Sequence, residues 1–289
     1  MPDFSAAPLS FWIVAAGLIG LAVGSFLNVV IYRLPVMMER QWQADAHATL
    51  HPDDEAPPAE RFDLAAPRSR CPSCGHAITW WENIPVLSFL FLRGKCSACG
   101  TAISWRYPLV ELMTALLSAA VVVRWGASWD SVAYIALLWA LIALALIDFD
   151  TTLLPDSITL PLLWLGLLWH AVLHPAQLSS AVWGAVVGYL ALWIVYQGFK
   201  LLTGKEGMGF GDFKLLAALG AWFGVAALLP IILLSSICGA VIGIALQALK
   251  LTERGRPIPF GPFLAAAGIL LLLIGPDTLV AMLLPSAGA

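Results

Sequence analysis

Charged residues are scarce in this chain of 289 residues. Asp, Glu, Lys and Arg together make up 11% of the sequence, whereas 60% of the residues are hydrophobic. Soluble globular domains carry roughly 25% charged residues, so this composition excludes an ordinary soluble domain. The formal net charge of −3 says little about partners because the charges are so unevenly placed. We expect membrane lipid around the protein, and no nucleic acid.

Apolar segments take up most of the chain. A helix needs about 20 apolar residues to cross a hydrocarbon core of ~30 Å, and eight segments approach this length. Only a tight turn near Gly224 can separate the sixth segment from the seventh. The predicted fold class is an all-α polytopic membrane protein with about eight transmembrane helices, at approximately 9–34, 107–124, 131–147, 158–172, 181–202, 213–225, 226–249 and 260–284.

The first apolar segment lacks the features of a cleaved signal peptide. No basic region leads it, and it ends in Tyr32-Arg33-Leu34-Pro35 rather than in small residues. We therefore expect it to remain as a transmembrane helix. The expected domains are this helix (1–36), a cytoplasmic loop (37–106) and a membrane domain of seven helices (107–289).

Lys and Arg are nearly absent from one set of loops. With eight spans, alternate loops lie on the same side, and one set holds every Lys and Arg except Arg124, which is 14 of the 15. Cytoplasmic loops carry the excess of Lys and Arg. The pattern therefore predicts that both termini lie outside and that four loops face the cytoplasm, namely 33–106, the loop at Asp148, 200–214 and 250–256.

Cysteine is also rare, but four of the five cysteines form two Cys-x-x-Cys pairs. Twenty-one residues separate the pairs, and a glycine follows each pair. This spacing is typical of a tetrahedral zinc site, and a cytoplasmic location favours reduced thiols over disulfides. Paired disulfides and a redox role are the alternatives. Because four thiolates fill the coordination shell of zinc, we expect a structural zinc ion at Cys71, Cys74, Cys96 and Cys99.

Two carboxylates lie at the edges of apolar segments, where charge is costly. Asp148 ends the third segment, and Asp212 begins the sixth. Two crossings lie between them, so both carboxyl groups should reach the same face at the same depth. An acidic residue at the edge of hydrocarbon indicates a functional site, and two such carboxyl groups in contact suit an aspartic hydrolase. Asp150 and Asp156 compete with Asp148 for this role, although Asp156 could instead cap the fourth helix.

The two helix ends predict different protonation states for the two aspartates. A helix C-terminus carries partial negative charge and an N-terminus partial positive charge. In a dyad that shares one proton, we therefore expect Asp148 to be protonated and Asp212 to be ionised.

Other residues are candidates for supporting this site. Gly209 and Gly211 would let the helix of Asp212 begin abruptly and another backbone approach closely. Lys214 would form part of a polar wall beside the acidic site. Glu111 lies one turn into the second segment, where it either pairs with a nearby Arg or Lys or lines the active cavity.

Ordered motifs over nearly the whole chain resemble those of the type IV prepilin peptidases, which are GxGD aspartic proteases. Both cysteine pairs and the Asp148 segment belong to the pattern. The other motifs are GSFLNVVIYRLP (24–35), WENIP (81–85), RYPLVEL (106–112), GKEGMGFGDFK (204–214) and PIPFGP (257–262).

The resemblance implies an aspartic endopeptidase of the bacterial cytoplasmic (inner) membrane, with Asp148 and Asp212 as catalytic residues facing the cytoplasm. Its substrates would be type IV prepilins and type II secretion pseudopilins, from which it removes the basic leader. The resemblance also implies N-methylation of the new N-terminus, with S-adenosylmethionine as methyl donor and the cysteine-bearing loop involved.

No glycine-rich Rossmann loop for this methyl donor is evident in the sequence, so its binding residues stay unassigned. Asn28, Arg33, Glu82 and Asn83 are polar candidates, each of which could equally hold the loop onto the membrane domain. Two alternatives are open. One is a peptidase without methyltransferase activity. The other is a cation-coupled transporter, which would explain the two aspartates but neither the cysteine pairs nor the order of the motifs.

Overall fold

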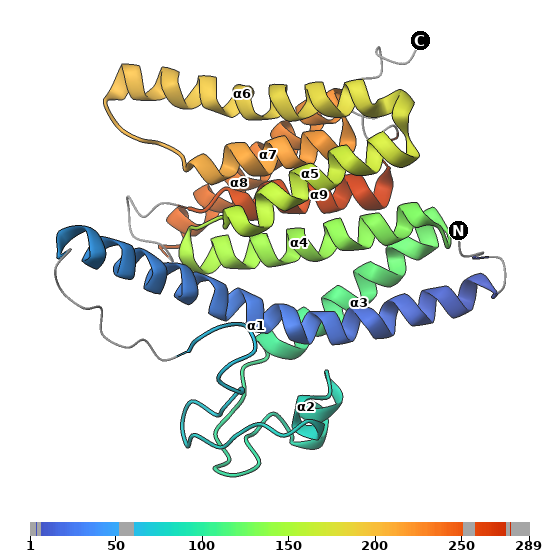
Figure 1. The fold of residues 1–289 in the computed structure, drawn as a ribbon, viewed down its shortest axis with the longest axis vertical. Coiled ribbons are helices and arrows are strands. Elements are labelled where there is room, and N and C mark those ends of the chain that lie inside the picture. The colour runs from blue at the N-terminus through green and yellow to red at the C-terminus, as the bar shows by residue number, and fades with distance from the viewer. Residues whose placement is uncertain (1–3, 5–6, 52–60, 251–257, 276–277, 279–289) are drawn as a thin grey trace. The chain divides into compact units, whose positions relative to one another are not determined.

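The computed structural model describes residues 4, 7–51, 61–250, 258–275 and 278 (Figure 1). Over these residues the regular structure is helical, apart from two isolated β-bridges. The chain divides into two compact units, Met1–Ser128 and Trp129–Ala289. The second long helix falls in the first unit because it packs along the first helix.

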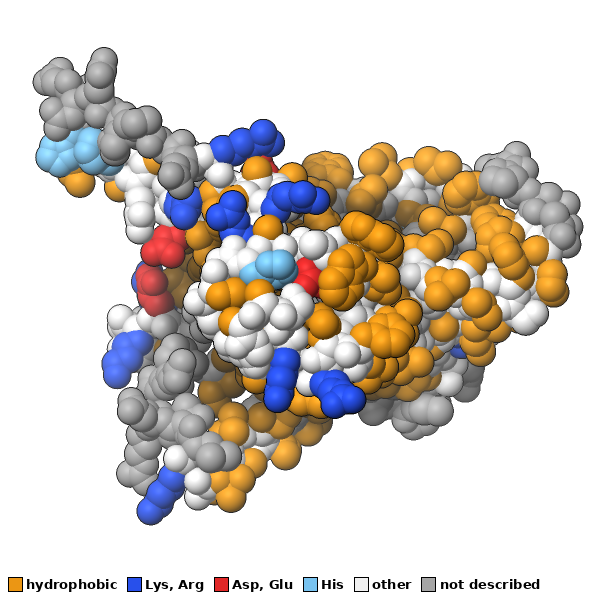
Figure 2. All heavy atoms as spheres, turned by 90° about the horizontal axis from the view of Figure 1, so that it is seen from below, with side chains coloured by type: hydrophobic (Ala, Val, Ile, Leu, Met, Phe, Trp, Pro, Cys, Tyr) orange, Lys and Arg blue, Asp and Glu red, His pale blue; other side chains and the backbone are white. Residues whose placement is uncertain are grey.

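Within the part of the chain that the structure describes, six helices are long and apolar enough to cross a membrane. They are α1 (Leu9–Leu50), α3 (Arg106–Trp125), α4 (Trp129–Thr151), α5 (Asp156–Leu173), α6 (Leu178–Thr203) and α8 (Leu228–Ala248). Large apolar side chains cover wide areas of the surface (Figure 2). The all-α polytopic fold class is thus confirmed. The count of eight spans stays a prediction, because it depends on two helices of 14 residues each, α7 (Phe210–Phe223) and α9 (Gly261–Ile274).

Helix α1 continues well beyond its apolar segment. It passes through Pro35 and ends at Leu50 after 42 residues. The extension contains strong helix formers such as Glu, Gln, Arg and Ala. Side chains four residues apart also bond along it: Gln41 donates to Asp45 at 2.8 Å, and Gln43 donates to Glu39 at 3.3 Å. Local propensity therefore carries the helix out of the apolar region into an exposed, polar stretch.

Small residues let α1 and α3 pack closely within the first unit. Gly20 and Gly24 are four residues apart, a spacing that favours close helix contact in membranes. A Cβ atom on Gly24 would lie 2.7 Å from the Cα atom of Glu111, and one on Gly20 would lie 2.8 Å from that of Ala115. The two backbones are thus in direct contact, which fixes α3 against α1.

Helix α7 is the buried centre of the second unit. Ten of its 14 residues are buried. It is roughly 21 Å long at 1.5 Å per residue, and a helix enclosed by protein need not match the hydrocarbon thickness. It ends at Gly224, whose φ of 79° permits an abrupt change of direction into the 3₁₀ turn Val225–Ala227 before α8. The tight turn predicted near Gly224 is therefore confirmed.

Neighbouring helices fix α7 in place on several sides. On α6, Gly184 and Gly188 repeat the four-residue spacing, and a Cβ atom on Gly188 would lie 2.7 Å from the carbonyl oxygen of Leu216. On α5, the carbonyl of Leu162 accepts a 2.8 Å hydrogen bond from the indole N–H of Trp222. These contacts hold the middle and the end of α7 against α6 and α5.

Candidate active site

Asp148 is buried in the last two turns of α4. Asp148 is only 4% exposed, whereas Asp150, two residues later, lies on the surface. Its Oδ2 atom accepts a 2.9 Å hydrogen bond from the backbone N–H of Gly261, the first residue of α9. A Cβ atom on Gly261 would lie 2.6 Å from that same oxygen. A glycine at this position therefore lets the start of α9 approach and orient the carboxyl group.

Asp212 is buried in the first turn of α7, where it is 7% exposed. Its carboxyl group is close enough to that of Asp148 for their charges to interact. Within the described residues, the Oδ1 atom of Asp212 is buried and has no hydrogen-bond partner. The fold thus brings together two carboxyl groups 64 residues apart in sequence and leaves one of their oxygens available to a water molecule or a substrate.

Leu154 lies between the beginnings of α7 and α9. A Cβ atom on Gly211 would lie 2.7 Å from the Cβ atom of Leu154, and one on Gly261 would lie 3.1 Å from its Cδ1 atom. Gly209 is less crowded, since a Cβ atom there would first meet Asp212 Oδ2 at 3.9 Å. Of the two predicted glycines, only Gly211 is needed for close packing.

Sequence reasoning did not single out Leu154 or Gly261. The only signal in the sequence was the place of Gly261 within the motif PIPFGP. Its first residue, Pro257, lies outside the described residues.

Asp156 and Lys214 form an ion pair. Asp156 follows Asp148 by eight residues, and Lys214 follows Asp212 by two. Lys214 Nζ lies 2.7 Å from both carboxylate oxygens of Asp156. Asp156 is the first residue of α5 and Pro155 is its N-cap, and among the described residues the hydrogen bonds to the Asp156 carboxylate come from Lys214. The pair links the start of α5 to α7, two residues after Asp212.

Glu111 is buried on α3, and its described contacts lie within the first unit. Its Oε2 atom accepts a 2.7 Å hydrogen bond from the backbone N–H of Val86. Glu111 therefore holds the cysteine-bearing segment against the α1–α3 pair. These contacts favour the structural reading over a place in the active cavity.

The four paired cysteines form one cluster, as the sequence predicted. Their sulfur atoms all lie within 4.8 Å of one another, and the group could hold a metal ion. The two loops have matching backbones: the N–H groups of Gly75 and Gly100 each donate a 2.9 Å hydrogen bond to the carbonyl of the first cysteine of the pair. The φ angles of these glycines are 72° and 73°, a conformation that glycine adopts without steric cost.

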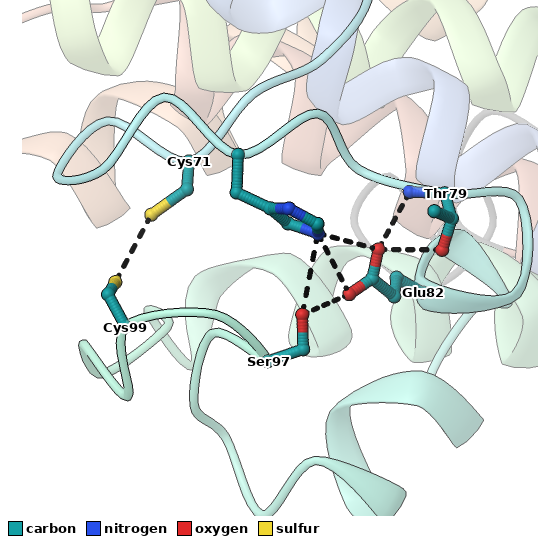
Figure 3. A network of polar contacts seen from close by, with 6 residues as sticks. Cys71, Thr79, Glu82, Ser97 and Cys99 are labelled. Atoms are coloured by element: carbon teal, nitrogen blue, oxygen red, sulfur yellow. Dashed lines mark hydrogen bonds and ion pairs between the residues drawn. The ribbon is translucent and has the colours of Figure 1, made fainter.

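Glu82 joins the two halves of this cluster (Figure 3). Its carboxylate accepts hydrogen bonds from the hydroxyl of Ser97, and from the N–H (2.7 Å) and hydroxyl (2.6 Å) of Thr79; His76 lies 3.2 Å away. These bonds, led by the one from Ser97 and followed by those from Thr79, lower the pKa of Glu82 to about 2. Glu82 therefore acts as an ionised bridge between the two cysteine loops.

Two more of the polar candidates for the methyl donor also make structural contacts. Arg33 donates hydrogen bonds to the carbonyls of Asp63 (2.8 Å) and Pro67 (2.6 Å). Asn28 donates to the carbonyl of Tyr107 at 3.2 Å. These contacts tie the polar loop to α1, and α1 to α3. Asn83 is exposed in the 3₁₀ turn Trp81–Asn83.

Two buried carboxyl groups at the ends of apolar helices are the arrangement that a membrane-embedded aspartic hydrolase requires. The chain matches two family models, "Bacterial Peptidase A24 N-terminal domain" over residues 18–125 and "Type IV leader peptidase family" over residues 135–244. These matches correspond to the two compact units. The chain belongs to the type IV leader peptidase family, and it is a multi-pass membrane protein.

Curated relatives cover nearly the whole chain. A protein of Aeromonas hydrophila named "Prepilin leader peptidase/N-methyltransferase" is 56% identical over 258 residues, which is 89% of each chain. Proteins with the same name from Stutzerimonas stutzeri and Pseudomonas aeruginosa are 56% and 53% identical over 268 residues, covering 93% of this chain and 92% of theirs. No solved structure gives a significant match to the chain.

Proposed function

We propose that this protein is a membrane-embedded aspartic endopeptidase that removes the leader of type IV prepilins and N-methylates the new N-terminus. The observation that carries the proposal is a pair of buried carboxyl groups, Asp148 near the end of α4 and Asp212 at the start of α7, whose charges are close enough to interact. Both lie in the segment that matches the leader peptidase family. The names of the curated relatives support both activities.

The two aspartates would divide the work of peptide hydrolysis. The ionised aspartate takes a proton from a bound water molecule, whose oxygen attacks the scissile carbonyl carbon. The protonated aspartate polarises the carbonyl oxygen, and a proton then reaches the leaving amine. Asp148 is oriented for this chemistry by the N–H of Gly261, and the buried Oδ1 of Asp212 is available to the water or the substrate.

The assignment of the protonated form to Asp148 and the ionised form to Asp212 stays a prediction. It follows from the helix ends on which they lie. A pH–rate profile tests the dyad itself: two acidic limbs are expected, and a single limb would count against a pair of titrating carboxyl groups.

We infer that the four-cysteine cluster binds zinc in a structural role. Four sulfurs about 2.3 Å from a tetrahedral zinc ion would lie about 3.8 Å from one another, and the sulfurs of Cys71 and Cys99 are 3.8 Å apart. Four thiolates would complete the shell of the ion. Metal analysis of the purified chain should find one zinc per chain and none in a Cys71→Ser/Cys99→Ser variant. Equal zinc in both proteins would remove the assignment.

The wider assignments rest on the family and on the distribution of charge. The methyl donor is S-adenosylmethionine, and the substrates include pseudopilins of type II secretion. The protein lies in the bacterial inner membrane with the active site facing the cytoplasm and both termini in the periplasm, because 14 of 15 basic residues fall in loops of one side.

Intact mass spectrometry of a prepilin tests the proposal. The substrate is incubated with the purified protein and S-adenosylmethionine, and loss of the leader plus one added methyl group is expected. Asp148→Asn and Asp212→Asn should each slow cleavage by at least about 10³-fold, since acid–base catalysis contributes up to about 10⁴. Asp150→Asn is the matched control, because this neighbouring aspartate is exposed.

The other outcomes discriminate between the alternatives. Cleavage without methylation would retain the peptidase and remove the second activity. Cleavage that survives both active-site substitutions would refute the proposed mechanism. A folded protein that cuts no tested prepilin would instead direct attention to cation transport.

A further inference from the structure

A short helix in the cysteine-bearing segment exposes large apolar side chains. Helix α2 (Leu87–Phe91) presents Leu87, Leu90 and Phe91 at relative exposures of 50%, 60% and 80%. Their spacing of three and four residues places them on one side of the helix. Trp105, which directly precedes α3, is 73% exposed. We call these four side chains the apolar face. Such exposure in a polar loop indicates a surface that contacts something apolar.

The anchoring of α2 places this face at the depth where α3 enters the membrane. Val86, directly before α2, donates its N–H to Glu111 at 2.7 Å. Glu111 lies five residues after the start of α3 at Arg106, which is about 7.5 Å along the helix. At this level α3 itself exposes Leu109 and Leu112, as a helix facing lipid does. The polar interface on each side of the hydrocarbon core is about 5–7 Å thick, so α2 lies beside this interface.

A cavity with two basic side chains adjoins the apolar face. It has a volume of about 410 Å³, and its lining includes Leu90, Arg93, Lys95 and Trp105. No acidic side chain lines it. Among the described residues neither Arg93 nor Lys95 has a side-chain hydrogen bond or ion-pair partner.

We propose that the apolar face inserts into the membrane interface and that the cavity binds the phosphate headgroup of an anionic phospholipid. Trp, Phe and Leu beside basic residues are the composition of interfacial anchors, and basic pockets next to a membrane helix bind anionic headgroups. The phosphate contacts Arg93 and Lys95, while Leu90 and Trp105 accompany the acyl chains. The membrane thus holds the cysteine cluster close to its surface, independently of the polar tie through Glu111.

Lipid binding to the full-length chain in detergent tests the headgroup site. Native mass spectrometry compares phosphatidylglycerol with phosphatidylcholine of the same acyl chains. Two basic residues near an anionic surface together favour binding of the anionic lipid over the zwitterionic one roughly 30-fold. Arg93→Gln/Lys95→Gln should abolish most of this preference.

A matched control comes from the repeat within the cluster. Lys95 pairs with Ala102 in the second cysteine loop as Arg70 pairs with Ala77 in the first. Arg68→Gln/Arg70→Gln therefore removes the same charge from the equivalent loop and should leave the preference within about threefold of wild type. An equal loss in both double variants would show a general effect of charge and would overturn the headgroup site.

Photo-crosslinking tests the insertion of the apolar face. A benzophenone amino acid at Phe91, in full-length protein in phosphatidylglycerol nanodiscs, should form lipid adducts. The same probe at Ser73, which is exposed in the first cysteine loop, should form none. Adducts only to protein at position 91 would show a protein contact surface instead and would overturn the proposal. Neither readout needs peptidase activity, so failure of the proposed function would leave both tests valid.

Discussion

Replacement of Gly261 by alanine tests whether the start of α9 positions the active-site carboxyl group. The added Cβ atom would lie 2.6 Å from Oδ2 of Asp148 and 3.1 Å from Cδ1 of Leu154. Real Cβ atoms almost never approach another atom within 3.0 Å, and contacts below 3.4 Å are rare. The carboxyl group must therefore move by about 0.4–0.8 Å, the difference between these limits and 2.6 Å. This movement would also disturb its 2.9 Å hydrogen bond from the Gly261 N–H.

The consequence for catalysis should be larger than the consequence for folding. A misplacement of about 1 Å at a reacting group costs on the order of 100-fold in rate, so we expect kcat/KM for leader cleavage to fall about 10- to 100-fold. Overpacking of this kind destabilises a fold by about 1–3 kcal/mol. The backbone of Gly261 does not lie in the left-handed region, so alanine adds no conformational strain there.

Leader cleavage and thermal unfolding should be measured on the same detergent-solubilised preparations. Gly198→Ala is the matched control, because a Cβ atom at this position on α6 meets nothing within 4 Å. It should keep full activity and equal or higher stability, since alanine favours helix over glycine by about 1 kcal/mol. If Gly261→Ala cleaves within twofold of wild type, the proposed positioning of Asp148 is refuted.

Three further experiments probe the contacts around the two sites. Gly211→Ala should lose at least about tenfold in leader cleavage because its Cβ atom would lie 2.7 Å from Leu154. Gly209→Ala, with 3.9 Å of space, should stay within about threefold of wild type; equal losses would contradict this distinction. For Asp156 and Lys214, a double-mutant cycle of unfolding should give a coupling below about 1 kcal/mol, since side-chain exposures of 53% and 28% leave the pair screened by solvent. A larger coupling would show a more enclosed pair. Glu82 has a pKa lowered to about 2 from an ordinary 4.5, so its ionisation stabilises the fold above pH 4.5 and this contribution is lost as pH falls toward 2. The stability difference between wild type and Glu82→Gln, followed by fluorescence, should shrink over that interval, and a pH-independent difference would exclude an ionised bridge.

The cysteine cluster and the apolar helices could be predicted because their signals are local. Four cysteines in two short pairs predict one metal site whatever the surrounding fold, and the cluster has this form. Apolar segments likewise predict helices, because a membrane offers no partners for free backbone groups. The tight turn at Gly224 could be predicted for the same reason, because this glycine lies between two apolar segments.

The C-terminal end of α1 and the packing of the helices were harder to predict from the sequence. The apolar segment ends near Leu34, but helix propensity carries α1 on to Leu50. The four-residue spacings of Gly20 with Gly24, and of Gly184 with Gly188, were present in the sequence and were signals for close contact. The spacing predicts only that one face of a helix permits close packing. It does not predict that the partner helices are α3 and α7.

Hydropathy, cysteine spacing and costly charges act over short stretches, so the class of the protein, the four-cysteine cluster and the two candidate catalytic aspartates could be predicted from the residues alone. The surroundings of each carboxyl group became known only from the folded chain. Gly261 on Asp148, Leu154 against Gly211, and Glu82 between the cysteine loops are contacts between distant segments. Such contacts depend on how helices approach in space, which the order of the residues does not state.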